Sequence, residues 1–140
     1  MKKLEFGWFL PTAGDSTAYG LPEASVDADS EYFERVITAA ENAGFTYLLI
    51  PVAEQCWEAY ITGAFMAAQS SKISMLIAAR PGYVNPVLLA KMIATFDQLS
   101  GGRICVNLIA GQAELEIKAE GITYEKEDRY ALMEEEVSIM

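Results

Sequence analysis

The sequence predicts an α/β fold in which about four parallel strands alternate with about four helices, within a single domain over residues 1–140. Apolar runs of strand length alternate with segments of helical periodicity, which is the pattern of a β/α repeat. The strand runs are apolar throughout, which indicates parallel strands covered on both faces. Such a repeat fits half of a (β/α)8 barrel or an open doubly wound sheet, and the absence of a Gly-x-Gly-x-x-Gly turn disfavours the second.

The first β/α unit is expected between the N-terminus and Gly44. Residues 4–10 are apolar and aromatic, and Pro11 ends this first predicted strand. Residues 12–29 are rich in Gly, Pro, Ser and Asp and predict a long loop, a type that is usually functional in a compact domain. A helix is predicted from Ser30, because apolar residues recur every three or four positions until Gly44.

The next units repeat this order along the chain. Strands are predicted over 46–50, 73–79 and 104–109, and helices over 56–70 and 86–99. A polar loop is expected after Gly111. It leads to an amphipathic helix that begins at Lys126 and has Tyr130, Met133 and Val137 on one side.

Charge and composition exclude several classes of function. The formal net charge is −10, so no basic stripe is expected for nucleic acid or an anionic membrane. The chain contains no histidine, which excludes Ser/His/Asp and Cys/His nucleophilic chemistry within it. Cys56 and Cys105 lie far apart and predict neither a disulfide scaffold nor a metal site.

The chain also lacks the signals of membrane insertion and secretion. No apolar run approaches the roughly 20 residues that a membrane span needs. Residues 1–7 have no apolar h-region followed by a small-residue cleavage site. A cytoplasmic location is therefore expected.

Three segments resemble the luciferase-like flavin-dependent monooxygenases, and are most similar to the alkanesulfonate monooxygenase branch. They are residues 9–15 (FLPTAGD), residues 44–51 (GFTYLLIP) followed by Cys56, and residues 94–103 (ATFDQLSGGR) running into 107–111 (NLIAG). Ala13 stands where enzymes of that branch usually have histidine, and Ala110 where the family often has threonine. The resemblance implies that the fold is the N-terminal half of a TIM (β/α)8 barrel.

The resemblance also implies a chemistry. Reduced FMN, supplied by a separate flavin reductase, would react with O2 to a flavin C4a-peroxide that attacks a small-molecule substrate. An alkanesulfonate or a similar small organosulfur compound is the expected substrate. The flavin would carry the difficult chemistry, and the protein would orient it and exclude water.

Active sites of such barrels lie at the carboxyl ends of the strands, which selects the candidate residues. The expected FMN contacts are Val52, Ala53, Asn107, Glu116, Arg129 and Tyr130. Val52 and Ala53 could instead be packing residues, and Asn107 could bond to neighbouring backbone. Arg129 and Tyr130 could instead belong to a solvated ion-pair network with nearby acidic residues.

Three further residues have alternative interpretations. Arg80 directly follows the third predicted strand and could bind a sulfonate or phosphate, or form a surface salt bridge. Cys56 is expected at the start of a helix, where the helix dipole would lower the pKa of its thiol and favour a catalytic contact, or it is buried packing. Arg103 precedes the fourth strand and is therefore interpreted as structural.

An isolated half barrel is expected to be limited in two respects. Phosphate in such barrels is commonly held after the seventh and eighth strands, so this chain should bind FMN weakly or not at all. Its two outer strands would have unpaired edges, which predicts a homodimer or higher homo-oligomer, or a rearrangement of the terminal segments. A noncatalytic flavin-binding relative and an assembly-only role are the alternatives.

Overall fold

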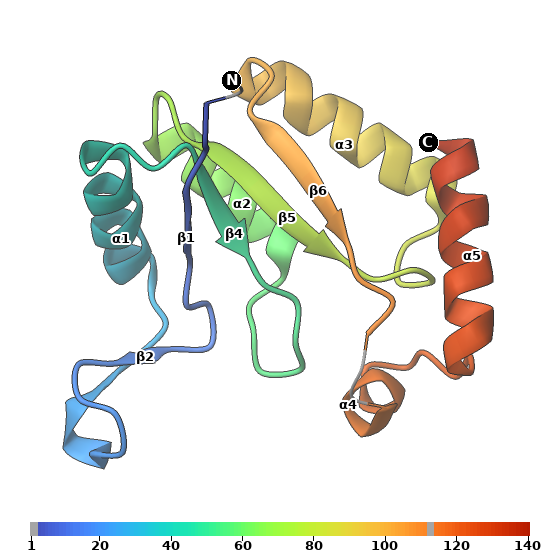
Figure 1. Ribbon diagram of the computed structural model, residues 1–140, viewed down its shortest axis with the longest axis horizontal. Helices are drawn as coiled ribbons and strands as arrows, with labels where there is room; N and C mark the ends of the chain where they lie inside the picture. The colour runs from blue at the N-terminus through green and yellow to red at the C-terminus, as the bar shows by residue number, and fades with distance from the viewer. Residues whose placement is uncertain (1–2, 112–113) are drawn as a thin grey trace.

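A four-stranded parallel sheet forms the centre of the chain in the computed structural model, which describes residues 3–111 and 114–140 (Figure 1). The strand order is β1-β4-β5-β6, and every pair in the sheet is parallel. The strands are β1 (Gly7–Phe9), β4 (Tyr47–Ile50), β5 (Ser74–Ala79) and β6 (Ile104–Leu108). The predicted parallel α/β repeat is confirmed.

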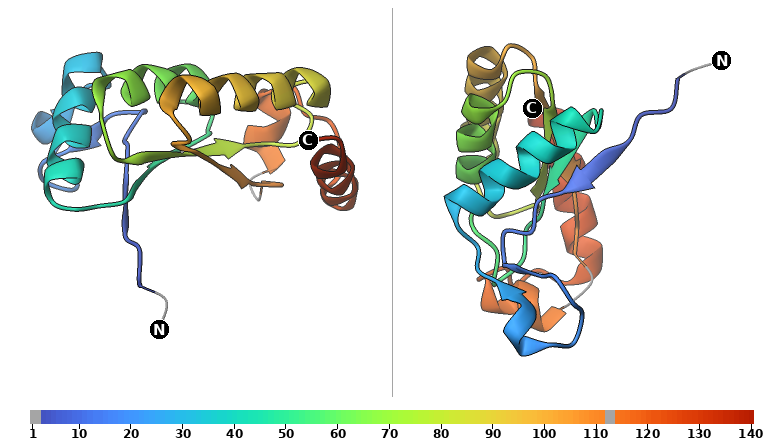
Figure 2. Two further views of the ribbon diagram at one scale, coloured as in Figure 1. Left: turned by 90° about the horizontal axis from the view of Figure 1, so that it is seen from above. Right: turned by 90° about the vertical axis from the view of Figure 1, so that its left-hand side faces the viewer.

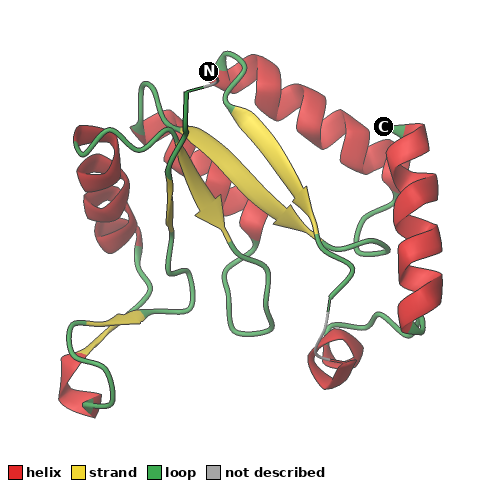
Figure 3. Ribbon diagram, in the orientation of Figure 1, coloured by secondary structure: helices red, strands yellow, loops and turns green. Residues whose placement is uncertain are grey.

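The helices that connect these strands lie on one side of the sheet. The connecting helices are α1 (Ser30–Asn42), α2 (Ala59–Gln69) and α3 (Pro86–Ser100). Two further helices, α4 (Glu114–Ala119) and α5 (Lys126–Ile139), follow β6. The left view of Figure 2 shows α2 and α3 in one layer above the sheet, with α1 at the end of that layer, and Figure 3 distinguishes helices and strands by colour. The expectation of helices on both faces is wrong for this chain, because these three helices all pack on the same face.

The two faces of the sheet consequently differ in burial. Leu48, Ile50, Met75 and Ile77 point toward the helices and belong to the buried core. Side chains alternate along a strand, so the intervening residues point to the other face. On that face Phe9, Leu49, Leu76 and Cys105 are in register across the sheet, and Phe9 is 47% exposed. This uncovered apolar face corresponds to the interior of a closed barrel.

The segment between β1 and α1 contains more structure than the predicted loop. A short antiparallel pair joins β2 (Asp15–Ser16) to β3 (Ser25–Val26), with a 3-10 turn over Pro22–Ala24 between them. The Tyr32 hydroxyl donates a hydrogen bond to Asp15 Oδ2 at 2.5 Å, which ties this hairpin to α1. The loop therefore stands beside the sheet as a small separate hairpin.

Side-chain caps fix where the connecting helices begin. Asp29, Glu58 and Asn85 are the N-caps of α1, α2 and α3, and their side chains accept backbone N–H groups of the first turn. At the end of α3, Gly101 adopts a left-handed conformation with φ of 69°. The helix predicted from residue 56 therefore begins three residues later, because Glu58 is its cap.

The C-terminal part departs most from expectation. Residues 112–113 of the predicted loop lie outside the described residues, and α4 follows where only loop was expected. In α5 the predicted apolar side is wrong: Tyr130 and Val137 are about half exposed, whereas Arg129 and Glu136 are buried. Polar contacts with the β5–α3 and β6–α4 loops, rather than an apolar stripe, set the orientation of α5.

The sheet has two open edges among the described residues. β1 pairs only with β4, and β6 pairs only with β5. None of the described helices combines the length and apolar character that crossing a membrane would require.

Candidate functional site

A pocket of about 730 Å³ opens at the carboxyl ends of β4 and β5. It lies among the β4–α2 loop, the first turn of α2, the β5–α3 loop and the end of α4. Its lining residues include Val52, Ala53, Glu54, Cys56, Trp57, Glu58, Tyr60, Arg80, Tyr83, Glu120 and Ile122. Four predicted site residues, Val52, Ala53, Cys56 and Arg80, thus meet in one cavity.

Arg80 is the charged centre of this pocket. Its side chain is only 7% exposed and is ion-paired with Glu116 of α4 and with Glu120, which directly follows α4. A third hydrogen bond runs from Nη2 to the Val52 carbonyl oxygen at 3.2 Å. Burial alone would lower the pKa of Arg80, but the hydrogen-bonded Glu116 and the nearby Glu120 raise it. Of the two alternatives for Arg80, the salt bridge is present, but it is largely buried and not at the surface.

Arg129 holds the loop that follows β6. Its Nε donates to the Ala110 carbonyl at 2.8 Å, and Nη1 donates to the Tyr124 carbonyl at 2.8 Å. Arg129 is 2% exposed, and its nearest carboxylate is Glu114 at 4.0 Å. The alternative of a solvated ion pair is wrong for Arg129, since backbone carbonyls take most of its hydrogen bonds.

Asn107 lies on the uncovered face of the sheet, near the carboxyl end of β6. Its strand neighbours Val106 and Leu108 pack against the core, so the Asn107 side chain points the opposite way. It is half-buried and is in register with Ala78 of β5. An amide here is available to a ligand that lies against the uncovered face.

Two expected site residues have surroundings that differ from those predicted. Cys56 lines the pocket but lies in the β4–α2 loop, so the prediction that it begins a helix is wrong. Its backbone N–H donates to Ala53 O at 2.9 Å. Tyr130 is 48% exposed on α5 and does not line the pocket. Arg103, by contrast, is confirmed as structural, because it binds Ser70 Oγ and the Ala67 and Ile73 carbonyls at the other end of the sheet.

Sequence reasoning missed two tyrosines and one glutamate that shape the pocket. Burial, together with the Glu58 and Glu136 charges, raises the pKa of Tyr60 to about 12. Burial and the Glu120 carboxylate raise the pKa of Tyr83. Glu120 could have been found only from its pairing with Arg80, which is 40 residues away in the sequence.

Comparison with known proteins then decides the family. The model of the luciferase-like monooxygenase family matches residues 4–140, which is nearly the whole chain. This chain belongs to the luciferase-like monooxygenase family.

Solved structures place this luciferase-like chain in a larger barrel. EDTA monooxygenase from Chelativorans sp. BNC1 matches with a TM-score of 0.79 and 17% identity, over 99% of this chain and 37% of that one. A long-chain alkane monooxygenase matches with a TM-score of 0.79 and 20% identity, over 99% and 38%. The oxygenating constituent of 3,6-diketocamphane monooxygenase of Pseudomonas putida, in complex with FMN, matches with a TM-score of 0.69 and 20% identity. This match covers 96% of this chain and 38% of that one.

The luciferase-like chain thus spans less than two fifths of these structures. Its sheet and helices form part of a (β/α)8 barrel, as the sequence predicts. In this frame the loops after β4, β5 and β6 are the carboxyl rim, defined here as residues 51–53, 80–82 and 109–111.

Proposed function

We propose that this chain forms part of the site of a monooxygenase that uses reduced FMN and O2 to oxygenate a small organic substrate. The observation that carries the proposal is the pocket at the carboxyl rim, in a chain of the luciferase-like family. In (β/α)8 barrels the active site lies at this end of the strands. A separate flavin reductase and a cytoplasmic location are parts of the same proposal.

The residues at the rim fit a flavin ring better than a flavin phosphate. Val52 and Ala53 offer half-buried apolar contact, and Asn107 offers an amide on the uncovered face. The two arginines near these residues already have partners: Arg80 binds two carboxylates, and Arg129 of α5 binds carbonyls. We therefore place the isoalloxazine ring, and not the phosphate, near these residues.

The remaining expected FMN contacts are Arg129, Glu116 and Tyr130, which would approach the flavin ring or position the backbone beside it. Arg129 would position the Ala110–Gly111 backbone, since it donates to both carbonyl oxygens. Glu116 would reach the flavin from α4 beside Arg80, and Tyr130 would approach it from α5. Bound reduced FMN would supply the activation of O2, and the buried side chains of the pocket would keep water away from it.

The sequence motifs favour an alkanesulfonate or a similar small organosulfur compound as substrate. Cys56 lines the pocket and would contact this substrate. A sulfonate would need Arg80 as its counter-charge, so it would have to displace Glu116 or Glu120 from the guanidinium. A homodimer or higher homo-oligomer would cover the uncovered face of the sheet.

Titration of the chain with FMN, followed by flavin fluorescence, tests the flavin part of the proposal. Weak binding is expected, and Asn107→Leu should weaken it further because an amide contact is lost. Asn42→Leu is the matched control, because Asn42 is exposed at the end of α1. Equal effects of the two variants would show that Asn107 does not contact the flavin. Tight stoichiometric binding by the wild-type chain would contradict the proposal that it holds only part of the flavin site. Binding without turnover in the presence of a reductase and O2 would favour a noncatalytic flavin-binding relative.

A further inference from the structure

The charges that line the pocket are mostly negative. Glu54, Glu58 and Glu120 line it together with a single basic residue, Arg80. Glu116 lies beside them as the second carboxylate on Arg80. These four carboxylates against one guanidinium make this cavity more favourable for a cation than for an anion.

Arg80 has no free charge to offer an anionic ligand. Its two terminal nitrogens are ion-paired with Glu116 and Glu120, and one of them also donates to the Val52 carbonyl. Displacing a glutamate from this pair would leave a carboxylate without its counter-charge in a buried place. Removing one partner of a buried ion pair is strongly unfavourable.

A polar atom without a partner indicates that the pocket takes a ligand. Tyr60 lines the pocket and is 7% exposed, and its hydroxyl has no hydrogen-bond partner in the described part of the chain. Buried polar groups normally find partners, so a bound molecule with its own polar head accounts for this hydroxyl.

The remaining lining suits an organic cation. Trp57, Ala59, Val84, Leu89 and Ile122 contribute apolar surface. Trp57 and Tyr83 are aromatic residues of this lining, and aromatic faces attract ammonium groups. The Tyr83 ring already lies 5.9 Å from the Arg80 guanidinium, which leaves Trp57 for the ligand. Apolar walls with aromatic rings and carboxylates match an alkyl body that carries an amine.

We propose that this pocket takes a small organic molecule with an apolar body and a positively charged amine head, in place of the alkanesulfonate that the sequence motifs favour. The Tyr60 hydroxyl accepts one ammonium N–H, while Glu54 and the net negative charge of Arg80, Glu116 and Glu120 together supply the opposite charge. This inference rests on the proposed monooxygenase function, because it names the substrate class of the same site. Its test uses no flavin, so a failure here leaves the FMN titration to decide the function separately.

Three probes of equal chain length provide the test: hexylamine, hexanol and hexanesulfonate, each titrated into the ¹⁵N-labelled chain at constant ionic strength. The amides of Gly82 and Gly121, which line the pocket, report binding. Those of Gly20 and Gly44 lie in other parts of the fold and serve as controls. Hexylamine should bind at least about tenfold more tightly than hexanesulfonate, with hexanol between them. Tighter binding of hexanesulfonate, or no localised shift with any probe, would overturn the proposal.

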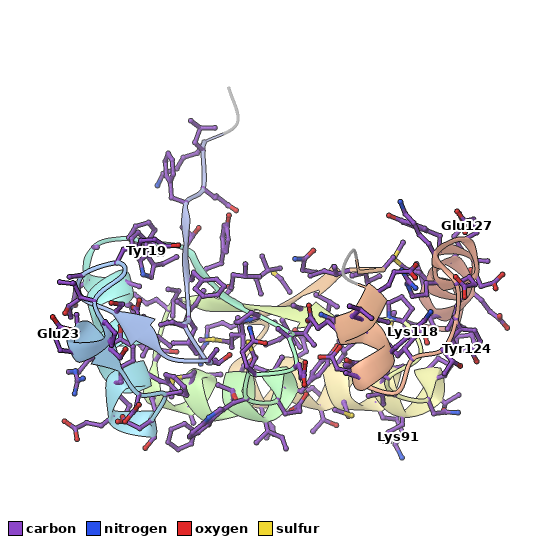
Figure 4. The ribbon with its side chains drawn as sticks, turned by 90° about the horizontal axis from the view of Figure 1, so that it is seen from below. Tyr19, Glu23, Lys91, Lys118, Tyr124 and Glu127 are labelled. Atoms are coloured by element: carbon purple, nitrogen blue, oxygen red, sulfur yellow. The ribbon has the colours of Figure 1, made fainter. Side chains whose placement is uncertain are left out.

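Substitutions of single glutamates separate a pocket charge from the overall acidity of the chain. Glu54→Gln and Glu120→Gln should each weaken hexylamine binding by about threefold to tenfold. Glu54 is exposed, so its replacement leaves the fold intact even if Glu120→Gln does not. Glu23→Gln is the control, because Glu23 lies at the opposite end of the molecule from Lys118 of α4 (Figure 4). An equal loss of binding with Glu23→Gln would show attraction to net charge alone and would overturn the pocket assignment.

Discussion

Glu136 of α5 accepts a hydrogen bond from the Gly82 amide at 2.9 Å, across 54 residues of sequence. This bond ties the last helix to the loop that follows β5, beside the pocket. Gly82 has a φ of 85°, and an added Cβ would lie 3.2 Å from Leu132 of the same helix. The carboxyl rim is therefore held in place by α5 as well as by the sheet.

Replacement of Glu136 tests this tie. Glu136→Ala removes the acceptor and should lower the free energy of unfolding by about 2 kcal/mol, because a hydrogen bond to a charged group is lost. Glu136→Gln keeps a carbonyl oxygen for Gly82 and removes a buried charge, so it should cost less than about 1 kcal/mol. Urea denaturation measures both values. Equal losses would mean that the Gly82 contact contributes little.

Arg129 should contribute more to stability than an exposed arginine. Arg129→Met leaves the Ala110 and Tyr124 carbonyls without their donor and should cost about 2–3 kcal/mol in urea denaturation. Arg35→Met is the control, because Arg35 forms an exposed ion pair with Glu31 at 3.0 Å, worth about 0–1 kcal/mol. A loss for Arg129→Met no larger than that of the control would contradict the role of Arg129 in holding the loop after β6.

Glu41 should make the stability of the chain depend on acid pH. Burial raises the pKa of Glu41, but hydrogen bonds from the backbone of Ile73, Lys72 and Ser71 outweigh it and lower the value to about 2. A carboxyl with a depressed folded pKa stabilises above its unfolded pKa and loses that effect as pH falls through the folded value. The urea concentration at the unfolding midpoint should therefore decrease as the pH is lowered from 4.5 to about 2. Glu41→Gln should flatten this fall, whereas a matched Glu23→Gln variant should not.

Tyr60 should make the chain sensitive to alkali. Burial, with the Glu58 and Glu136 charges, raises its pKa from 10.0 to about 12, so its stabilising effect is complete below pH 10 and is lost toward pH 12. Tyr60→Phe should shift alkaline unfolding upward and stabilise the fold by up to about 1 kcal/mol, since the lost hydroxyl has no partner in the described residues. The same variant should weaken hexylamine binding. Destabilisation by Tyr60→Phe would mean that the Tyr60 hydroxyl forms a hydrogen bond in the folded chain, and would contradict this prediction.

The open edges should make the isolated chain self-associate. Phe6, Trp8 and Phe9 on or next to β1 are 62%, 55% and 47% exposed, and the outer side of this strand has no partner among the described residues. Size-exclusion chromatography with light scattering should show a dimer or larger species. Phe9→Lys should shift it toward monomer, because a charge on an edge strand opposes pairing. A stable wild-type monomer would contradict this expectation.

Much of the framework could be predicted because it depends on local signals. Continuous apolar runs located all four parallel strands, and the apolar spacing after Ser30 located α1. The start of α2 was placed too early, because Glu58 is an uncommon cap. The six-residue α4 was missed, because so short a helix has no periodic pattern to detect.

The site was harder to predict, because its interactions join distant parts of the chain. Position after a strand was enough to select Val52, Ala53 and Arg80. The partners of Arg80 were not accessible in this way, since Glu116 lies in the unpredicted α4 and Glu120 directly follows it. The same reason applies to α5, where contacts of Arg129 with the loop after β6 override the apolar stripe.

The most direct test of a flavin site at the carboxyl rim is an amide chemical-shift map of the ¹⁵N-labelled chain with added FMN. Weak, saturable shifts are expected at Val52, Ala53, Asn107 and Gly111, with little change at Gly44 and Gly101 near the other end of the strands. Shifts concentrated at that other end, or scattered without localisation, would contradict the account.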